Sequence, residues 1–259
     1  MSIILIIGTA LFGCIVGSFL NVVVLRYQTG RGIGGRSSCG SCNRVLRWFE
    51  LVPVLSFLVQ RARCRRCKSK LSWQYPLVEA ATGLVTAALV VAHGFTVVTV
   101  IYMLAAWLLI AITVYDMRHF IIPDAWTAAI AVIGIGGQIV GVLPLVPAAT
   151  SWLDVAAGAL FALPFLILWR LSRGRLMGLG DPKLMVALGL LLGFSAGLSA
   201  LTLAFWVGAV VSVLLMLISQ LRSAKQVVTL QTAVPFGPFL ALGALVQMVV
   251  PVPILTLFF

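Results

Sequence analysis

Two aspartates, Asp116 and Asp181, lie beside long apolar segments in a chain that has only six acidic residues among 259. Asp116 follows one apolar run and Asp181 precedes another, so each carboxylate is expected at the mouth of a helix. Two carboxylates that meet can share a proton, because like charges at short range cannot both ionise. One can then activate a water while the other, protonated, polarises a carbonyl group. This is the chemistry of aspartyl proteolysis, and it makes the chain a candidate membrane-embedded peptidase.

The residues around both aspartates favour this interpretation. Gly178 and Gly180 precede Asp181. They permit close backbone approach and unusual torsions, so that an extended substrate strand can lie beside the carboxylate. Pro123 and Pro182 suit the first turns of helices that begin just beyond each aspartate. These glycines and prolines are therefore candidates for shaping the site.

The alternative is that both aspartates form interfacial ion pairs or cap helices. Asp116 would then pair with Arg118 or Arg175, and Asp181 would pair with Lys183. A single aspartate would fit this explanation well. Two carboxylates, each at a boundary rich in Gly and Pro, favour catalysis.

Three more residues are candidates for a supporting role. Asp124 closes the motif Ile122-Pro123-Asp124 at the start of an apolar segment, where capping or positioning is expected. Lys183 belongs to the motif around Asp181. Glu79 lies inside an apolar segment, and ionisable residues there usually mark a functional site.

The composition indicates which elements must position these groups. Hydrophobic residues make up 62% of the chain and charged residues 9%. Continuous apolar stretches of spanning length predict a helical membrane protein, since a β-barrel requires alternation and an open sheet would leave backbone groups unpaired in lipid. We expect an all-α polytopic membrane protein with about eight transmembrane helices. Their expected ranges are 3–25, 76–93, 96–115, 125–143, 153–170, 183–195, 197–219 and 236–257.

The basic residues predict which side of the membrane each loop occupies. The net charge is +12, and +10 of it lies in residues 26–75. Lys and Arg gather in or beside 26–75, 116–124, 171–182 and 220–235, which the positive-inside rule assigns to the cytoplasm. Both termini are then outside, and the two aspartates lie at the cytoplasmic face. The basic loop suits lipid headgroups; without interleaved aromatic residues we expect no nucleic-acid partner.

Four of the five cysteines form two CxxC pairs in the basic loop, Cys39 with Cys42 and Cys64 with Cys67. Four thiolates can complete a closed tetrahedral zinc site, and the pairs lie just beyond the usual zinc-ribbon spacing. Two disulfides are disfavoured in a reducing cytoplasm, and redox-active pairs lack a thioredoxin-like context. We therefore expect a structural zinc ion in a zinc-ribbon-like loop too small and basic to build its own core.

Several further segments of the chain form a recognisable set when they are taken in order. They are Gly17–Asn21, Arg36–Cys39 with the second CxxC pair, Tyr75–Glu79, Asp116 with Ile122–Asp124, Gly178–Leu188 and Pro235–Phe239. In this order they resemble the bacterial type IV prepilin leader peptidase/N-methyltransferase family, whose peptidases are membrane aspartic proteases of the GxGD type. The chain departs from the family at 49–53, where Asp-Asn-Ile-Pro is more common.

The resemblance implies that Asp116 and Asp181 are the catalytic pair. The substrate would be a prepilin or pseudopilin, cut after the glycine that ends its basic leader, at the cytoplasmic face of the bacterial inner membrane. The cysteine loop implies methylation of the new N-terminus by S-adenosylmethionine, although no nucleotide fingerprint places the donor site. The expected divisions are a first helix, 1–25, a methyltransferase-associated loop, 26–75, and a peptidase core, 76–259. The oligomeric state is left open.

Two other classes of function compete with the peptidase. A zinc-stabilised membrane scaffold could recruit partners through the basic loop, but it gives the two aspartates no role. A cation-coupled transporter could use the aspartates as ion sites. Transport sites lie near the bilayer midplane and often within inverted repeats, whereas both aspartates are predicted at one face and no such repeat is evident.

Overall fold

The computed structural model describes residues 2–30, 32–143, 152–221 and 234–251. Within these ranges all the named elements are helices, and the only β-pairing consists of two isolated bridges. The chain forms two compact units, 1–114 and 115–259, and each is described by itself. The boundary falls near the end of α4 (Val97–His119).

The first unit is built on α1 (Ile3–Arg26) and α3 (Gln74–His93), which pack together. Glycines allow this contact: a Cβ atom on Gly13 would lie 2.8 Å from the Cα atom of Gly83. Small residues at membrane-helix interfaces let backbones approach in this way. The Trp107 indole of α4 donates a hydrogen bond of 3.0 Å to the Thr86 hydroxyl of α3.

The two CxxC pairs occupy two turns of the same design, related by a shift of 25 residues. The Cys39 amide donates to the Arg44 carbonyl, and the Cys64 amide donates to the Ser69 carbonyl, both at 2.9 Å. One isolated antiparallel bridge closes each turn, Ser38 with Val45 and Arg63 with Lys70. The basic loop therefore contains an internal repeat that presents two thiols from each turn.

A short 3-10 helix (Trp48–Glu50) and α2 (Leu55–Val59) lie between the two turns. The Glu50 side chain forms an ion pair with Arg44 and is only 1% exposed. Its second carboxylate oxygen accepts a 2.8 Å hydrogen bond from the Arg47 amide. The Glu50 carboxylate thus ties the first cysteine turn to the 3-10 helix.

The second unit contains the end of α4 with α5 (Asp124–Ile139), α6 (Trp152–Ser172), α7 (Gly180–Leu221) and α8 (Gly237–Val249). Helix α7 packs against α5, α6 and α8. Its closest approaches again use glycine: a Cβ atom on Gly134 of α5 would lie 2.8 Å from the Leu190 backbone. Helix α7 is thus the central element of this unit.

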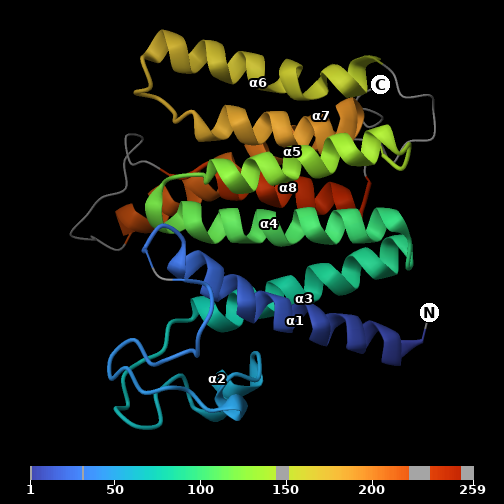
Figure 1. Cartoon of the computed structure of the whole chain (residues 1–259). Coiled ribbons are helices and arrows are strands. Elements are labelled where there is room, and N and C mark those ends of the chain that lie inside the picture. The colour runs from blue at the N-terminus through green and yellow to red at the C-terminus, as the bar shows by residue number, and fades with distance from the viewer. Residues whose placement is uncertain (1, 31, 144–151, 222–233, 252–259) are drawn as a thin grey trace. The chain divides into compact units, whose positions relative to one another are not determined.

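Helix α7 reverses direction at Gly193, whose φ of 73° and ψ of −173° are not helical. Before this point its contacts with α6 are antiparallel, since Asp154 bonds the Phe194 amide and Gly158 faces Val186. Beyond it they run the other way: Phe161 lies against Gly197, and Phe165 stacks on Phe205. The two halves of α7 therefore form a helical hairpin (Figure 1).

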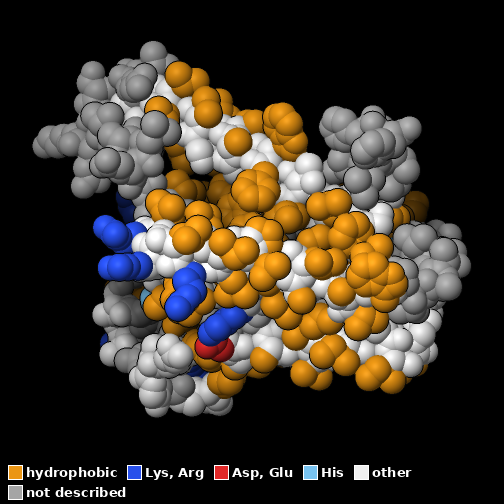
Figure 2. Space-filling view, turned by 90° about the horizontal axis from the view of Figure 1, so that it is seen from above, with side chains coloured by type: hydrophobic (Ala, Val, Ile, Leu, Met, Phe, Trp, Pro, Cys, Tyr) orange, Lys and Arg blue, Asp and Glu red, His pale blue; other side chains and the backbone are white. Residues whose placement is uncertain are grey.

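The protein is an all-α, multi-pass membrane protein. Five of the described helices are long and apolar enough to cross a membrane, α1, α3, α4, α6 and α7, while α5 and α8 are shorter apolar helices. Since α7 has two halves, a helical segment corresponds to each of the eight predicted spans; residues 252–257 of the last span lie outside the described ranges. Figure 2 shows a face dominated by hydrophobic side chains, with Lys and Arg at one edge.

Candidate active site and metal-binding cluster

Asp116 lies in the last turn of α4 and is buried, with 4% of its surface exposed. The sequence predicted a loop here, but α4 continues to His119 and is ended by Phe120, whose φ is 54°. The Phe120 amide donates a 2.8 Å hydrogen bond to the Asp116 carbonyl. The aspartate is therefore held on a rigid helix end rather than in a loop.

Asp181 lies in the first turn of α7, which begins at Gly180 and carries Pro182 in the same turn. This agrees with the predicted use of proline at the helix start. A Cβ atom on Gly180 would lie 3.0 Å from the Cβ atom of Ile122, so glycine lets α7 begin directly against the segment that follows Asp116. Neither Gly178 nor Gly180 has a positive φ, so the predicted unusual torsions are not found.

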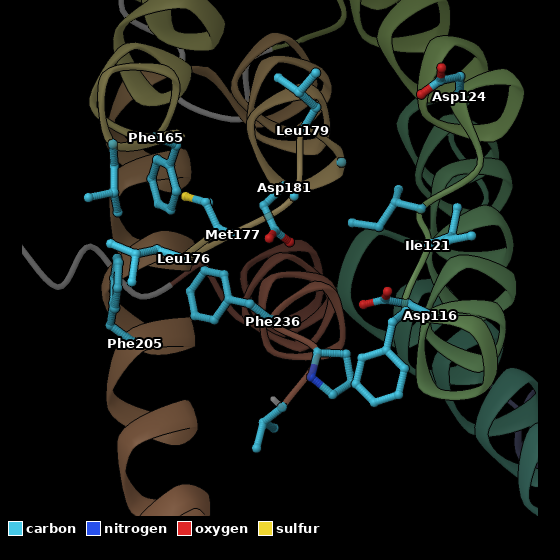
Figure 3. Close-up of a pocket in the computed structure, with 17 residues that line it drawn as sticks. Asp116, Ile121, Asp124, Phe165, Leu176, Met177, Leu179, Asp181, Phe205 and Phe236 are labelled. Atoms are coloured by element: carbon cyan, nitrogen blue, oxygen red, sulfur yellow. The ribbon is translucent and has the colours of Figure 1, made fainter. Parts of the chain in front are cut away.

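Both aspartates line one cavity of about 650 Å³, and every residue that lines it belongs to the second unit. The two carboxyl groups interact electrostatically. In Figure 3 the carboxyl groups of Asp116 and Asp181 point into the same space from two different helices. Residues 65 positions apart in sequence are thus brought to one site.

The ion pairs of the alternative explanation do not occur in the described part of the chain. Lys183 Nζ contacts both carboxylate oxygens of Asp124, at 2.7 and 2.8 Å, rather than Asp181. No described Lys or Arg forms an ion pair with Asp116 or Asp181. Asp124 is also not a helix cap, because Pro123 holds that position, and it lies at the rim of the cavity.

Gly237 is a site residue that was predicted only as part of a family motif, Pro235–Phe239. Its backbone amide, at the N-terminus of α8, donates a hydrogen bond to the Asp116 carboxylate. A Cβ atom here would lie 2.5 Å from Asp116 Oδ2, so only glycine fits without displacing the carboxylate. The sequence feature that could have indicated Gly237 is its place directly before Pro238, because proline is common in the first turn of a helix.

Three phenylalanines form an apolar wall of the cavity. Phe165 comes from α6, Phe205 from the second half of α7, and Phe236 from the residue before α8. The ring centroids of Phe205 and Phe236 are 5.1 Å apart, and both rings lie near Phe165, at 6.1 and 6.3 Å. Figure 3 shows this wall, with Leu176 and Met177, on the far side of Asp181 from Asp116.

Glu79 is placed in the first unit, on α3, and it is not among the residues that line the cavity at Asp116. It is buried, with 7% of its surface exposed, and accepts a 2.7 Å hydrogen bond from the Val54 amide. It lines a separate cavity of about 330 Å³ within the first unit. The structure therefore associates this predicted supporting residue with the cysteine loop.

The four loop cysteines form one cluster that could hold a metal ion. Their Sγ atoms all lie within 4.8 Å of one another, and those of Cys39 and Cys67 are 3.8 Å apart. Backbone amides of Ser41 and Cys42 lower the pKa of the Cys39 thiol to about 6. Hydrogen bonds from Ser69 lower the pKa of Cys67. The cluster thus already favours thiolates at two of its positions.

The pKa of the Cys42 thiol is raised rather than lowered by its place in the cluster. The Arg44 amide lowers its pKa, but burial and the neighbouring thiols outweigh that bond and raise the value to about 11. Several thiolates cannot form side by side without a positive charge among them. A bound cation would supply that charge.

Two carboxylates that line one cavity of a helical membrane protein are the arrangement expected of a membrane aspartic protease, and the four-cysteine loop is a cluster that could hold a metal ion. Residues 11–93 match the model of the bacterial peptidase A24 N-terminal domain, and residues 103–213 match that of the type IV leader peptidase family.

Curated relatives carry the name prepilin leader peptidase/N-methyltransferase. One from Aeromonas hydrophila is 32% identical over 90% of this chain and 86% of its own length, and one from Pseudomonas aeruginosa is 30% identical over 92% and 88%. A relative from Myxococcus xanthus is 35% identical over 79% of this chain, which spans 61% of that protein. No solved structure matches the chain. The chain belongs to the type IV leader peptidase family.

Proposed function

We propose that this chain is a prepilin leader peptidase in which Asp116 and Asp181 are the catalytic pair. The observation that carries the proposal is that these two carboxylates line one cavity without a described cationic partner. A structural role would leave one buried and one half-buried carboxylate unneutralised, at a cost in stability. Catalysis gives both groups a use.

The reaction follows from a pair that shares one proton. The ionised carboxylate takes a proton from a water molecule, whose oxygen attacks the carbonyl carbon of the scissile bond. The protonated carboxyl donates a hydrogen bond to the carbonyl oxygen as it gains charge. The tetrahedral intermediate then collapses, the C–N bond breaks, and the leaving amine takes the proton that the first carboxylate had accepted from water. The Gly237 amide holds Asp116 in position throughout.

The cavity offers different surroundings to the two sides of a substrate. Its wall of phenylalanines suits the apolar segment of a prepilin or pseudopilin. The rim carries the Lys183–Asp124 pair, whose side chains are 48% and 72% exposed. A polar leader can lie at this rim while the apolar segment remains among the helices. Cleavage after the glycine that ends the leader fits this division.

Sidedness follows from the basic residues. In the second unit the described Lys and Arg are Arg118, Arg170, Arg173, Arg175 and Lys183, all near the helix ends that carry Asp116 and Asp181. The positive-inside rule then puts the active site at the cytoplasmic face of the bacterial inner membrane and both termini outside.

The cysteine cluster suits a structural zinc ion. Zn–S bonds of about 2.3 Å in a tetrahedron place sulfur atoms about 3.8 Å apart. The Sγ atoms of Cys39 and Cys67 are separated by this distance. The thiolates would be the ligands of Zn²⁺ and the ion would neutralise them. The relatives' shared name supports a second activity, N-methylation of the new N-terminus by S-adenosylmethionine.

A cleavage assay on membrane-inserted prepilin tests the catalytic pair. Asp116→Asn and Asp181→Asn should each lower cleavage by about 10³-fold or more, because neither variant can complete the proton exchange. Asp154→Asn is the matched control: it removes a carboxylate outside both cavities, and its amide oxygen can still accept the Phe194 amide hydrogen. Cleavage by either dyad variant near the wild-type rate would refute the assignment.

A further inference from the structure

The first unit has its own cavity, of about 330 Å³, between α1, the cysteine loop and the start of α3. This volume is at the lower end of the range for small-molecule sites, roughly 300–1,000 Å³. All its lining residues belong to the first unit, so it is separate from the cavity that holds the aspartates. Peptide cleavage makes no use of it.

The acidic residues of the first unit converge on this cavity. Residues 1–114 contain only two, Glu50 and Glu79, and both line it. Glu50 is neutralised by Arg44. Glu79 accepts hydrogen bonds from the Val54 amide and the Ser18 hydroxyl, but it pairs with no Lys or Arg in the described ranges. One buried carboxylate is therefore left without a counter-ion.

Another polar side chain of the lining is already engaged. The Asn21 amide nitrogen donates to the carbonyls of Gly17 and Tyr75, and its oxygen accepts from Gln74. Arg26 donates to three carbonyls of the loop, at 2.6 to 3.2 Å. Among the charged groups of the lining, Glu50 has an ion pair and Arg26 has backbone carbonyls as partners. Glu79 has neither kind of partner in the described part of the chain.

The unpaired carboxylate of the cavity favours a ligand with a cationic group. Glu50 is paired with Arg44 and Arg26 donates to loop carbonyls, which leaves Glu79 as the charged group of the lining that is available to a ligand. A buried carboxylate is stable when a positive group meets it and costly when none does. A small molecule with a net positive charge fits this requirement better than a phosphate or a carboxylic acid.

We infer that this cavity binds the methyl donor, with Glu79 beside the sulfonium group. The inference rests on the methyl-transfer half of the proposed function. S-adenosylmethionine carries a sulfonium, an ammonium and a carboxylate, and so has a net charge of +1 and a cationic sulfur that the Glu79 carboxylate can meet. Its demethylated product has a neutral sulfur, so Glu79 favours the donor over the product.

The transfer step requires no further co-reactant. The terminal amine of the cleaved substrate forms a bond to the methyl carbon with its lone pair. The C–S bond breaks and its electron pair remains on sulfur, which becomes a neutral thioether. The methylated ammonium then releases a proton to water. Glu79 acts as a binding and positioning group that holds the positive charge before transfer.

This location also gives the cysteine cluster a role in the second activity. Cys39 and Cys64 both line the cavity, along with Ser37, Ser38 and Gly40 of the first turn. A metal ion that fixes the two turns would thereby fix one wall of the donor site. The loop then positions the donor without contributing a reactive group.

Calorimetric titration of the full-length protein in detergent with S-adenosylmethionine and S-adenosylhomocysteine tests the inference. Glu79→Gln keeps an acceptor for the Val54 amide but removes the charge. The Glu79→Gln substitution should weaken the binding of S-adenosylmethionine about tenfold or more. It should weaken the binding of S-adenosylhomocysteine less than about threefold. Ser56→Phe, which fills the cavity, should weaken both ligands. Asp154→Asn should change neither.

Retained metal and an unchanged unfolding temperature establish that each variant is folded. If folded Glu79→Gln and Ser56→Phe bind both ligands as the wild type does, the proposed location of the donor site is wrong. The proposal of methyl transfer would still stand. A wild-type protein that cleaves prepilin but neither binds nor uses S-adenosylmethionine would overturn the inference together with the methyl-transfer proposal. Preserved binding in Asp116→Asn would show that the donor site is independent of the peptidase pair.

Discussion

Carboxylates line both cavities of this protein, yet the groups around them differ. In the second unit Asp116 and Asp181 interact with each other beside an apolar wall, without a described cation. In the first unit Glu50 is neutralised by Arg44 and Glu79 is held by hydrogen bonds in a polar lining. In our proposals the same chemical group serves proton exchange in one place and charge recognition in the other.

The difference teaches what an acidic residue in a membrane protein requires. Two like charges that face each other are stable only when they share a proton, and this makes them a general acid and base. A carboxylate that faces no like charge and no cation is best stabilised by a ligand. The comparison therefore predicts that changes in one cavity affect one activity and leave the other in place.

In the first unit the largest expected effect comes from removing a ligand of the cysteine cluster. Cys39→Ser should reduce bound zinc from about one equivalent to less than about 0.1, because a closed four-thiolate site tolerates no missing ligand. Binding of S-adenosylmethionine should fall with it, since Cys39 also lines that cavity. Metal analysis and calorimetry of the purified variant measure both changes.

Cleavage of prepilin by Cys39→Ser should persist, because every residue that lines the aspartate cavity lies between 116 and 236. Cys14→Ser is the matched control, since it removes the fifth cysteine, on α1, and should keep the metal. Equal loss of cleavage and donor binding in Cys39→Ser, with the control unaffected, would contradict the independence of the two cavities.

A smaller effect is expected from the ion pair that neutralises one carboxylate of the first unit. Burial would raise the pKa of Glu50, but the Arg47 amide and the pairing with Arg44 outweigh it and hold the pKa below its usual range. Glu50→Gln should lower the unfolding temperature by several degrees at pH 7, because the Arg44 charge loses its partner. Differential scanning calorimetry measures this change.

The pH dependence of the same variant provides an internal check. A carboxyl whose pKa is lower in the folded than in the unfolded state stabilises the protein when the pH is above the unfolded-state pKa of about 4.3. This stabilisation is lost as the pH falls through the folded-state pKa. The difference between wild type and Glu50→Gln should therefore shrink below about pH 4. Loss of metal in acid affects both proteins alike and cancels in the difference. A difference that stays constant down to pH 3 would exclude the ion pair as its cause.

Much of the site could be predicted from sequence because its signals are local. Asp116 and Asp181 stood out as charges beside apolar runs, and the hairpin of α7 was expected as two spans. The pairing of Asp181 with Lys183, which belonged to the disfavoured alternative, does not occur for a local reason: residues two apart on a helix do not face each other. Lys183 instead reaches Asp124 on another helix.

The remaining features depend on contacts between distant segments. The Gly237 amide reaches Asp116 only because α8 returns to the end of α4, more than a hundred residues later. Glu79 could be recognised as an unusual carboxylate, but nothing local separates it from the peptidase site. Its assignment required the cavity that α1, the loop and α3 enclose together. Tertiary arrangement, rather than residue type, distinguishes its role.

The smallest effect is expected from the charged pair at the rim of the aspartate cavity. Lys183 and Asp124 lie at the starts of α7 and α5, and both side chains are well exposed. Exposed pairs contribute about 0.2–1 kcal/mol at most, because water screens them. Lys183→Met should therefore change stability little and cleavage less than about twofold. If the pair instead controls entry to the cavity, Lys183→Met and Asp124→Asn would change kcat/KM together and by equal factors, and their combination would have no additional effect. Kinetic measurement of the two variants and their combination distinguishes a solvated ion pair from a gate, and only a gate would connect this rim to the reaction at Asp116 and Asp181.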